Sequence, residues 1–251
     1  MISNNTKKFI KSLQRKKKRK EHGLFTVEGR KITEEIIKEC PETIKAVYVT
    51  QKFLEKNSEF PIPAEVISEK DMHYISQMKT PPGVLAVVKI PEVSFSAQNL
   101  INKNSLALDG IKDPGNLGTI IRIADWYGVE HVLCSEDCVD LYNPKVLQAT
   151  MGSFLRVKVL YTDLPETLAD LKEKIGAHVT GTVLNGIPIQ EFLQKNSCKT
   201  NVFVIGNEAF GISKEVSALQ DYGITLPKKG RAESLNAAVF TAVLLDKITC
   251  F

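Results

Sequence analysis

From residue 105 onward, short hydrophobic runs alternate with stretches whose apolar residues recur at helical spacing. The runs of strand length are 105–110, 131–135, 177–184, 201–208 and 223–227. The stretches of helical spacing are 117–128, 144–153, 165–176, 187–196, 213–220 and 233–248. This alternation predicts an α/β fold in which a mostly parallel sheet carries helices on both faces.

The first 90 residues predict a second, smaller α/β unit. A basic helix is followed by a strand at 23–29 and by a helical stretch at 30–40, which Pro41 ends. Two β-branched runs, 44–50 and 83–90, have strand length. Periodicity is weak beyond residue 90. We therefore expect an N-terminal domain at 1–95, a linker at 96–105 and a second domain at 106–251.

The composition is that of a soluble globular protein, with 43% hydrophobic and 25% charged residues. No apolar stretch approaches the roughly 20 residues of a membrane span, and the basic start has no apolar segment typical of a secretory signal. The five cysteines are odd in number and scattered, which argues against a disulfide framework. We expect a cytoplasmic protein that does not bind a membrane.

Positive charge is concentrated at the N-terminal end. Residues 1–31 hold eleven lysines and arginines against two glutamates, a net charge of +9, so the rest of the chain carries −5. A basic end on a mildly acidic body favours a polyanion such as RNA, although such a run can also be a solvated helix face. The expected RNA contacts are Arg15, Lys16, Arg19 and Arg30.

Three turn-rich segments, 109–118, 206–213 and 227–234, follow predicted strands, where α/β sheets bind ligands. In the first, we expect Asn116 to cap the following helix. Arg122 lies off the apolar stripe of that helix and suits a phosphate or carboxylate, the alternative being a surface pair with Asp125. The segment lacks the third glycine of a dinucleotide fingerprint, which argues against a nucleotide-dependent oxidoreductase, and it is not a P-loop because it lacks the Gly-Lys-Ser/Thr ending.

The other two segments add short polar side chains. Glu208 lies at the carboxyl end of a predicted strand and could bind a ribose or orient an arginine, or simply face a helix N-terminus. Ser234 is the expected cap of the last helix. Asn236 is less expected there, because it precedes a run of apolar residues, and the two side chains could point to one place.

The stretches DPGNLGTIIRIADWYG, VIGNEAFGIS and LPKKGRAESLNAAV, in this order and spacing, resemble the three motifs of the SpoU (TrmH-type) RNA 2′-O-ribose methyltransferases of the SPOUT class. The resemblance covers roughly residues 105–251. The stretch LQRKKKRKEHGLFTVEGRKI is similar, less specifically, to the RNA substrate-binding domain with a ribosomal-protein-like fold that many members carry.

This resemblance implies a parallel-sheet catalytic domain with a trefoil knot that binds S-adenosylmethionine, and a homodimer that modifies RNA. Ribosomal RNA is the favoured substrate by analogy with members that carry the extra domain, and transfer RNA is the alternative. The implied active-site positions are Asn116, Arg122, Glu208, Ser234 and Asn236. The implied cofactor positions are Thr182, Gly206, Asn207, Leu226 and Leu235. One departure is Ala209, where the family usually has glycine, which would cost about 1 kcal/mol if that residue has positive φ.

The implied reaction is in-line attack of a ribose 2′-hydroxyl on the sulfonium methyl group. Because a guanidinium stays protonated, we expect Arg122 to grip a phosphate and stabilise the developing alkoxide rather than act as a base. A non-catalytic RNA-binding module is an alternative function. A zinc site at His131, Cys134 and Cys138 is disfavoured by their spacing, so no metal is expected.

Overall fold

The computed structural model describes residues 2–249, which form two compact units. The first unit comprises the chain up to Glu92 together with Tyr142–Leu155. The second comprises Val93–Leu141 and the chain from Arg156 onward. The structure therefore groups residues 142–155 with the N-terminal part, whereas the sequence pattern placed them in the domain at 106–251.

The first unit is built on a sheet with the strand order β1-β4-β2-β3. The strands are β1 (Leu24–Glu28), β2 (Ile44–Thr50), β3 (Glu65–Ile67) and β4 (Val84–Lys89). β4 pairs antiparallel with both β1 and β2, and β3 pairs parallel with β2. The helices are α1 (Asn4–Ser12), α2 (Lys16–His22), α3 (Arg30–Glu39), α4 (Gln51–Lys56), α5 (Glu69–Ile75) and α7 (Pro144–Thr150).

The segment between β2 and β4 contains elements that the sequence pattern did not predict. β3 has three residues, too few to show an alternating pattern. The short helices α4 and α5 do carry a signal, because the side chains of Thr50 and Ser68 cap their first turns. The strands predicted at 23–29, 44–50 and 83–90 are confirmed.

Aromatic packing explains why residues 142–155 belong to the first unit. The fully buried Phe25 ring of β1 contacts the rings of Tyr142 and Phe154, with centroids 4.5 and 6.1 Å apart. Burying an aromatic ring removes a large apolar area from water, so these contacts stabilise the packing of residues 142–155 against β1.

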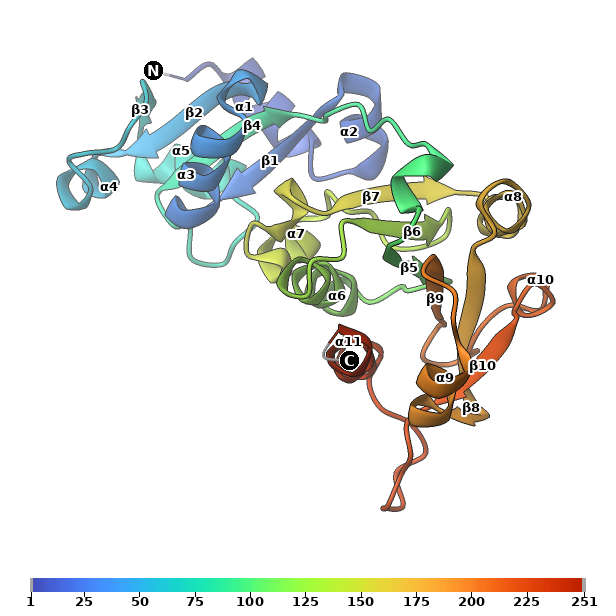
Figure 1. Ribbon diagram of the computed structural model, residues 1–251. Helices are drawn as coiled ribbons and strands as arrows, with labels where there is room; N and C mark the ends of the chain where they lie inside the picture. Colours follow the sequence, from blue (N-terminus) through green and yellow to red (C-terminus); the bar gives the residue numbers. More distant parts are fainter. Residues whose placement is uncertain (1, 250–251) are drawn as a thin grey trace. The chain divides into compact units, whose positions relative to one another are not determined.

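The second unit contains a parallel sheet with the strand order β10-β8-β9-β5-β6-β7, which confirms the predicted fold class (Figure 1). The strands are β5 (Asn104–Leu108), β6 (His131–Ser135), β7 (Lys158–Thr162), β8 (His178–Pro188), β9 (Asn201–Ile205) and β10 (Tyr222–Thr225). The helices are α6 (Pro114–Trp126), α8 (Leu164–Ile175), α9 (Ile189–Lys195), α10 (Lys214–Ser217) and α11 (Ala237–Thr249).

The sequence pattern missed β7, and it ended β8 four residues early. The expected linker is also structured, because Ala97–Leu100 forms a 3₁₀ turn (η2) and β5 starts at Asn104. Leu100 is fully buried in the core of the second unit, together with Leu133 and Val202. A single apolar residue in a polar segment was too weak a signal to predict that Leu100 is part of the core.

The buried stripe of α6 consists of Leu117, Ile120, Ile121 and Ala124, which agrees with the predicted periodicity. α6 lies against α11, where Leu244 and Leu245 are fully buried (Figure 1). Within residues 2–249, no helix is both long and apolar enough to cross a bilayer.

Candidate functional site

Three loops of the second unit follow the carboxyl ends of parallel strands: 109–113 after β5, 206–213 after β9 and 226–236 after β10. In a parallel sheet these ends share one edge, where ligands bind. β5 and β9 are neighbours, so the first two loops start side by side. The three loops correspond to the three motifs of the sequence.

The first loop ends in the N-cap of α6. The cap is Asp113, whose carboxylate accepts a hydrogen bond from the Asn116 backbone N–H at 2.8 Å, and Pro114 occupies the first helical position. The prediction that Asn116 caps the helix is therefore wrong. The helix begins three residues earlier than the pattern suggested, because Pro114 is favoured at its first position. This frees the Asn116 side chain for other contacts.

The Asn116 side chain joins the three loops. Its amide nitrogen donates to Glu208 of the second loop, and its amide oxygen accepts from the Asn236 amide nitrogen of the third loop at 2.8 Å. Residues 116, 208 and 236, far apart in sequence, thus form one hydrogen-bonded chain. We call this chain, Asn116 with Glu208 and Asn236, the amide–carboxylate cluster.

Asn236 is held by the helix that it precedes. α11 begins at Ala237, and the Asn236 side-chain oxygen accepts from the N–H groups of Ala238 and Val239 at 3.0 and 3.3 Å. Asn236 is thus the N-cap, and the prediction that Ser234 caps this helix is wrong. Ser234 lies outside the helix, is exposed, and makes no hydrogen bond with any residue between 2 and 249.

The second loop is a tight turn held by Asn207. The backbone groups of Asn207 and Gly211 exchange two hydrogen bonds of 2.9 Å. The Asn207 side-chain oxygen accepts from the N–H groups of Ala209 and Phe210 at 2.8 and 3.1 Å, and its nitrogen donates to the Gly110 carbonyl at 2.6 Å. The Asn207 side chain therefore shapes the loop, and a cofactor contact at this position stays a prediction.

Ala209 does not need the freedom of glycine. Among the non-glycine residues described, only Asn102 and Met151 have positive φ, whereas Gly211 in the same loop has φ +70°. The departure from the usual motif is therefore free of backbone strain.

Two residues that sequence reasoning did not single out, Asp109 and Gly110, connect the first two loops. The buried Asp109 carboxylate accepts from the Ser213 N–H at 2.7 Å, and its own N–H donates to Ile205. Gly110 has φ +71° and donates to the Ser135 hydroxyl at 2.9 Å. The signal available in the sequence was the Asp-Gly pair directly after an apolar strand.

Cys138 braces the same turn. Its buried thiol accepts a hydrogen bond from the Ile111 N–H at 3.2 Å and donates to the Leu108 carbonyl at 3.3 Å. Hydrogen bonding with Cys134 lowers the pKa of the Cys138 thiol to about 7. Within the described residues, no group of three or more His, Cys, Asp or Glu side chains could hold a metal ion.

Arg122 does not join the amide–carboxylate cluster. It is exposed, and among the described residues it forms no hydrogen bond or ion pair. Arg122 lies about 120° around α6 from Asn116 and shares an exposed stripe of the helix with Thr119 and Trp126. The alternative pairing with Asp125 is absent, because Asp125 binds Arg156 at 2.7 Å.

The residues expected to hold the cofactor lie at the same sheet edge. The Thr182 hydroxyl donates to the Val204 carbonyl at 2.9 Å, which leaves its oxygen able to accept another bond. Leu226 is half-buried and Leu235 is 50% exposed, so apolar side chains are available to cover an adenine ring. Backbone turns with exposed apolar side chains fit an adenosine moiety.

The expected RNA contacts of the first unit divide into two groups. Arg15 and Lys16 are exposed at the start of α2, and Arg30 is exposed while bonded to Glu34 and Asn57. Arg19 is only 4% exposed, and its guanidinium donates to the carbonyls of Leu13 and Gln14 at 2.9 and 2.8 Å. The structure therefore corrects the prediction for Arg19, which supports the turn between α1 and α2.

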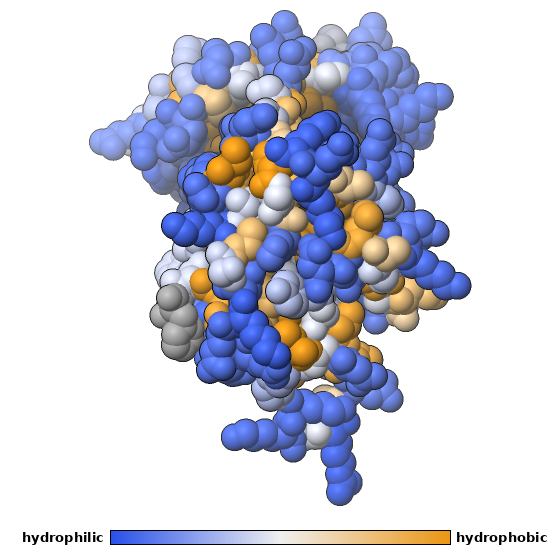
Figure 2. Space-filling model, turned by 45° about the vertical axis from the view of Figure 1, so that its right-hand side comes forward, coloured by the Kyte–Doolittle hydropathy of each residue, from blue (hydrophilic) through white to orange (hydrophobic). Residues whose placement is uncertain are grey.

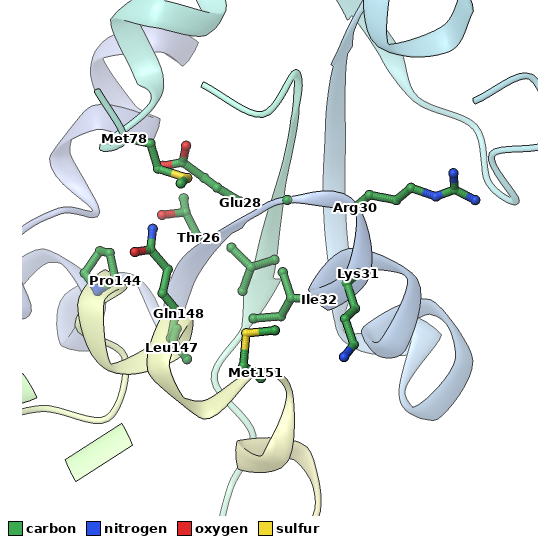
Figure 3. Close-up of a pocket in the computed structure, with 12 residues that line it drawn as sticks. Thr26, Glu28, Arg30, Lys31, Ile32, Met78, Pro144, Leu147, Gln148 and Met151 are labelled. Carbon is green, nitrogen blue, oxygen red and sulfur yellow. The ribbon is translucent and has the colours of Figure 1, made fainter. Parts of the chain in front are cut away.

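The first unit also contains a cavity of about 370 Å³ between the end of β1, the start of α3 and α7. Its lining includes Thr26, Glu28 and Gln148, and it also includes Arg30, whose guanidinium extends away from these three side chains (Figure 3). Burial raises the pKa of the Glu28 carboxyl, although hydrogen bonds from Ser76 and Gln77 act in the opposite direction. Those two bonds tie the end of β1 to residues 76 and 77.

Comparison with known proteins agrees with this arrangement. Residues 103–246 match the SpoU rRNA Methylase family, and residues 4–86 match the MRM3-like substrate binding domain. The chain is 33% identical over 237 residues to the 23S rRNA (guanosine(2553)-2'-O)-methyltransferase RlmP of Bacillus subtilis (strain 168), which covers 94% of this chain and 92% of that protein.

Solved structures extend the similarity to nearly the whole chain. A protein of the TrmH family from Porphyromonas gingivalis is 35% identical, with a TM-score of 0.85 and 98% of each chain covered. An AdoMet-bound rRNA methyltransferase from Sinorhizobium meliloti is 26% identical, with a TM-score of 0.83 and 98% and 95% of the two chains covered. The chain belongs to the SpoU rRNA methylase family and carries an N-terminal substrate-binding domain of the MRM3-like type.

Proposed function

We propose that this protein transfers the methyl group of S-adenosylmethionine to a ribose 2′-hydroxyl of RNA, with ribosomal RNA as the substrate. The observation that carries this proposal is the amide–carboxylate cluster, which joins three motif loops at the ligand-binding edge of a parallel sheet. The family supports the chemistry, and the Bacillus subtilis relative is named for 2′-O-methylation of 23S rRNA. Transfer RNA is the alternative substrate.

S-adenosylmethionine would supply an activated methyl group, with Thr182, Gly206, Leu226 and Leu235 around its adenosine. The protein must then hold the ribose in line with that methyl group, and such alignment is a large part of catalysis. In the cluster, Glu208 and Asn236 hold the two ends of the Asn116 amide. The second carboxylate oxygen of Glu208 and the second amide hydrogen of Asn236 would then be positioned to bind the ribose. Ser234 is free to reach the hydroxyl.

Arg122 would act from a second copy of the chain. It lies on a different helix face from Asn116, and the same exposed stripe carries Trp126, whose side chain is 83% exposed. α11, packed beside α6, exposes Val239 by 51%. Exposed apolar side chains on two helices that pack together favour a homodimer through these helices. The partner's Arg122 would then grip a phosphate and stabilise the developing alkoxide.

Methylation of ribosomal RNA fragments with labelled S-adenosylmethionine tests the proposal. Nuclease digestion should yield a 2′-O-methyl dinucleotide that resists cleavage, and a substrate with a 2′-deoxy sugar at the mapped position should accept no label. Calorimetry separates the alternative of a non-catalytic module, because a protein that binds RNA but no S-adenosylmethionine would contradict methyl transfer. We also propose that the protein is cytoplasmic.

RNA binding by the first unit should depend on exposed cations of α2. Replacing Arg15 and Lys16 by glutamine should weaken RNA binding at low salt and reduce the slope of log affinity against log salt concentration by about 1 to 2. Binding of S-adenosylmethionine, measured by calorimetry, should not change.

The matched control replaces Lys174 and Lys195, two exposed lysines of the second unit that already pair with Asp170 and Glu191. It removes the same charge. An equal loss of RNA affinity in the control would show that net charge, rather than this surface, governs binding.

A further inference from the structure

Phe210 is the most exposed of the large hydrophobic side chains described, with 90% of its surface accessible. It lies in the second motif loop, two residues after Glu208. An isolated exposed apolar residue needs no explanation by itself. The position of this ring and the rigidity of its loop provide the further evidence.

The loop holds the Phe210 backbone in a fixed geometry. The Phe210 N–H donates to the Asn207 side chain at 3.1 Å, within the turn that two backbone bonds between Asn207 and Gly211 close. The Gly110 carbonyl fixes the same asparagine from the first loop. Apart from the side-chain rotation, the ring therefore has little conformational freedom to lose when a ligand covers it.

The neighbouring third loop is polar and basic. Lys228, Lys229 and Arg231 are exposed, and none forms an ion pair with another residue that the structure describes. This loop extends from the body of the second unit (Figure 1), and its surface is hydrophilic (Figure 2). It is tied to the Phe210 loop through Asn236, Asn116 and Glu208. An exposed aromatic ring two residues from Glu208, with unpaired cations on a loop that is bonded to the same cluster, fits a nucleobase with its phosphates.

We propose that the Phe210 ring stacks on an unpaired nucleobase of the RNA substrate next to the ribose held at the amide–carboxylate cluster. The inference rests on the proposed function and adds to it a residue that binds the substrate RNA directly. A second copy of this chain is a poorer occupant, because the apolar residues that favour a dimer lie on α6 and α11, whereas Phe210 lies in a loop that is bonded through the cluster to the basic third loop.

Three substitutions test the aromatic requirement. Stacking needs a π-face rather than hydrophobic area, so Phe210→Tyr should retain the wild-type KM for RNA. Phe210→Leu and Phe210→Ala should both raise this KM about tenfold. kcat, the affinity for S-adenosylmethionine and the sedimentation coefficient should stay close to those of the wild type.

Two outcomes would overturn the proposal. A leucine variant with the wild-type KM would show that the ring contributes only hydrophobic area. An alanine variant that sediments as a smaller species would show that the ring covers another copy of the chain.

A fluorescence experiment separates this proposal from the proposed function. The chain has one tryptophan, Trp126, so Phe210→Trp adds a second. The fluorescence of the added tryptophan is the difference between the emission of the variant and that of the wild type. Titration with ribosomal RNA fragments should quench that difference, because a stacked base quenches indole emission. If the wild type methylates RNA but the added tryptophan is not quenched, the stacking proposal alone fails. If the quenching occurs without methylation, the proposed function fails while stacking stands.

Discussion

Replacing Arg122 by alanine is expected to lower kcat for RNA methylation by about 10²- to 10³-fold, the range typical for removing one group that stabilises transition-state charge. The free energy of unfolding should change little, because Arg122 is exposed and has no partner within residues 2–249. Single-turnover methylation with saturating S-adenosylmethionine measures the effect. Arg122→Lys should recover only part of the rate, because an ammonium cannot bind a phosphate in the bidentate way of a guanidinium.

Mixing Arg122→Ala with Asn116→Ala shows from which subunit Arg122 acts. Asn116→Ala should also be inactive, because it breaks the cluster at its centre. If Arg122 acts across a dimer, a mixed dimer of the two variants has one intact site, and an equal mixture should recover about a quarter of the wild-type rate. No recovery, in a mixture shown to exchange subunits, would place Arg122 in the site of its own chain or outside it.

The fold was largely predictable because its signals are local. The parallel sheet of the second unit follows from β-branched runs that alternate with amphipathic stretches, and α6 buries the stripe that its spacing indicates. The signal fails where an element is short or its anchor is a single residue. Examples are β3, with three residues, and the buried Leu100 in a segment expected to be a linker.

The site was predictable only in part, because the sequence does not reveal which polar atoms are already engaged. The polar residue types at 116, 208 and 236 indicated a functional site, and hydrogen bonds join these three side chains in the structure. The side chains of Asn207 and Arg19 are engaged within the chain, one with the backbone of its own loop and the other with the carbonyls of Leu13 and Gln14. The helix starts were misplaced for the same reason, since Asp113 and Asn236 cap α6 and α11.

The grouping of residues 142–155 shows a different limit. These residues follow β6 in the sequence, so a reading along the chain assigns them to the second domain. Their placement depends on Phe25 packing against Tyr142 and Phe154, more than a hundred residues away. Only long-range contacts decide such an assignment. The trefoil knot implied by the family resemblance stays a prediction.

Gly206→Ala is expected to have the second large effect, through sterics rather than backbone conformation. A Cβ at this position would lie 2.4 Å from the Gly211 carbonyl carbon and 2.6 Å from the Ile212 nitrogen. Both are backbone atoms, so the 207–211 turn must move away from β9. That shift separates Glu208 from Asn116 and changes the surface around the adenosine. We expect affinity for S-adenosylmethionine to fall more than about tenfold and kcat to fall about 10²-fold.

Two other glycines of the same unit provide the controls for this prediction. Gly211 has φ +70° and open space around its Cβ position, so Gly211→Ala introduces backbone strain of about 1 kcal/mol without a clash. Gly230 has neither constraint, so Gly230→Ala should match the wild type. Calorimetry of S-adenosylmethionine binding, together with thermal unfolding, ranks the three variants. If Gly206→Ala binds as tightly as Gly230→Ala, the close contact between residues 206 and 211 does not define the cofactor site, and Gly206 has no part in holding the methyl donor.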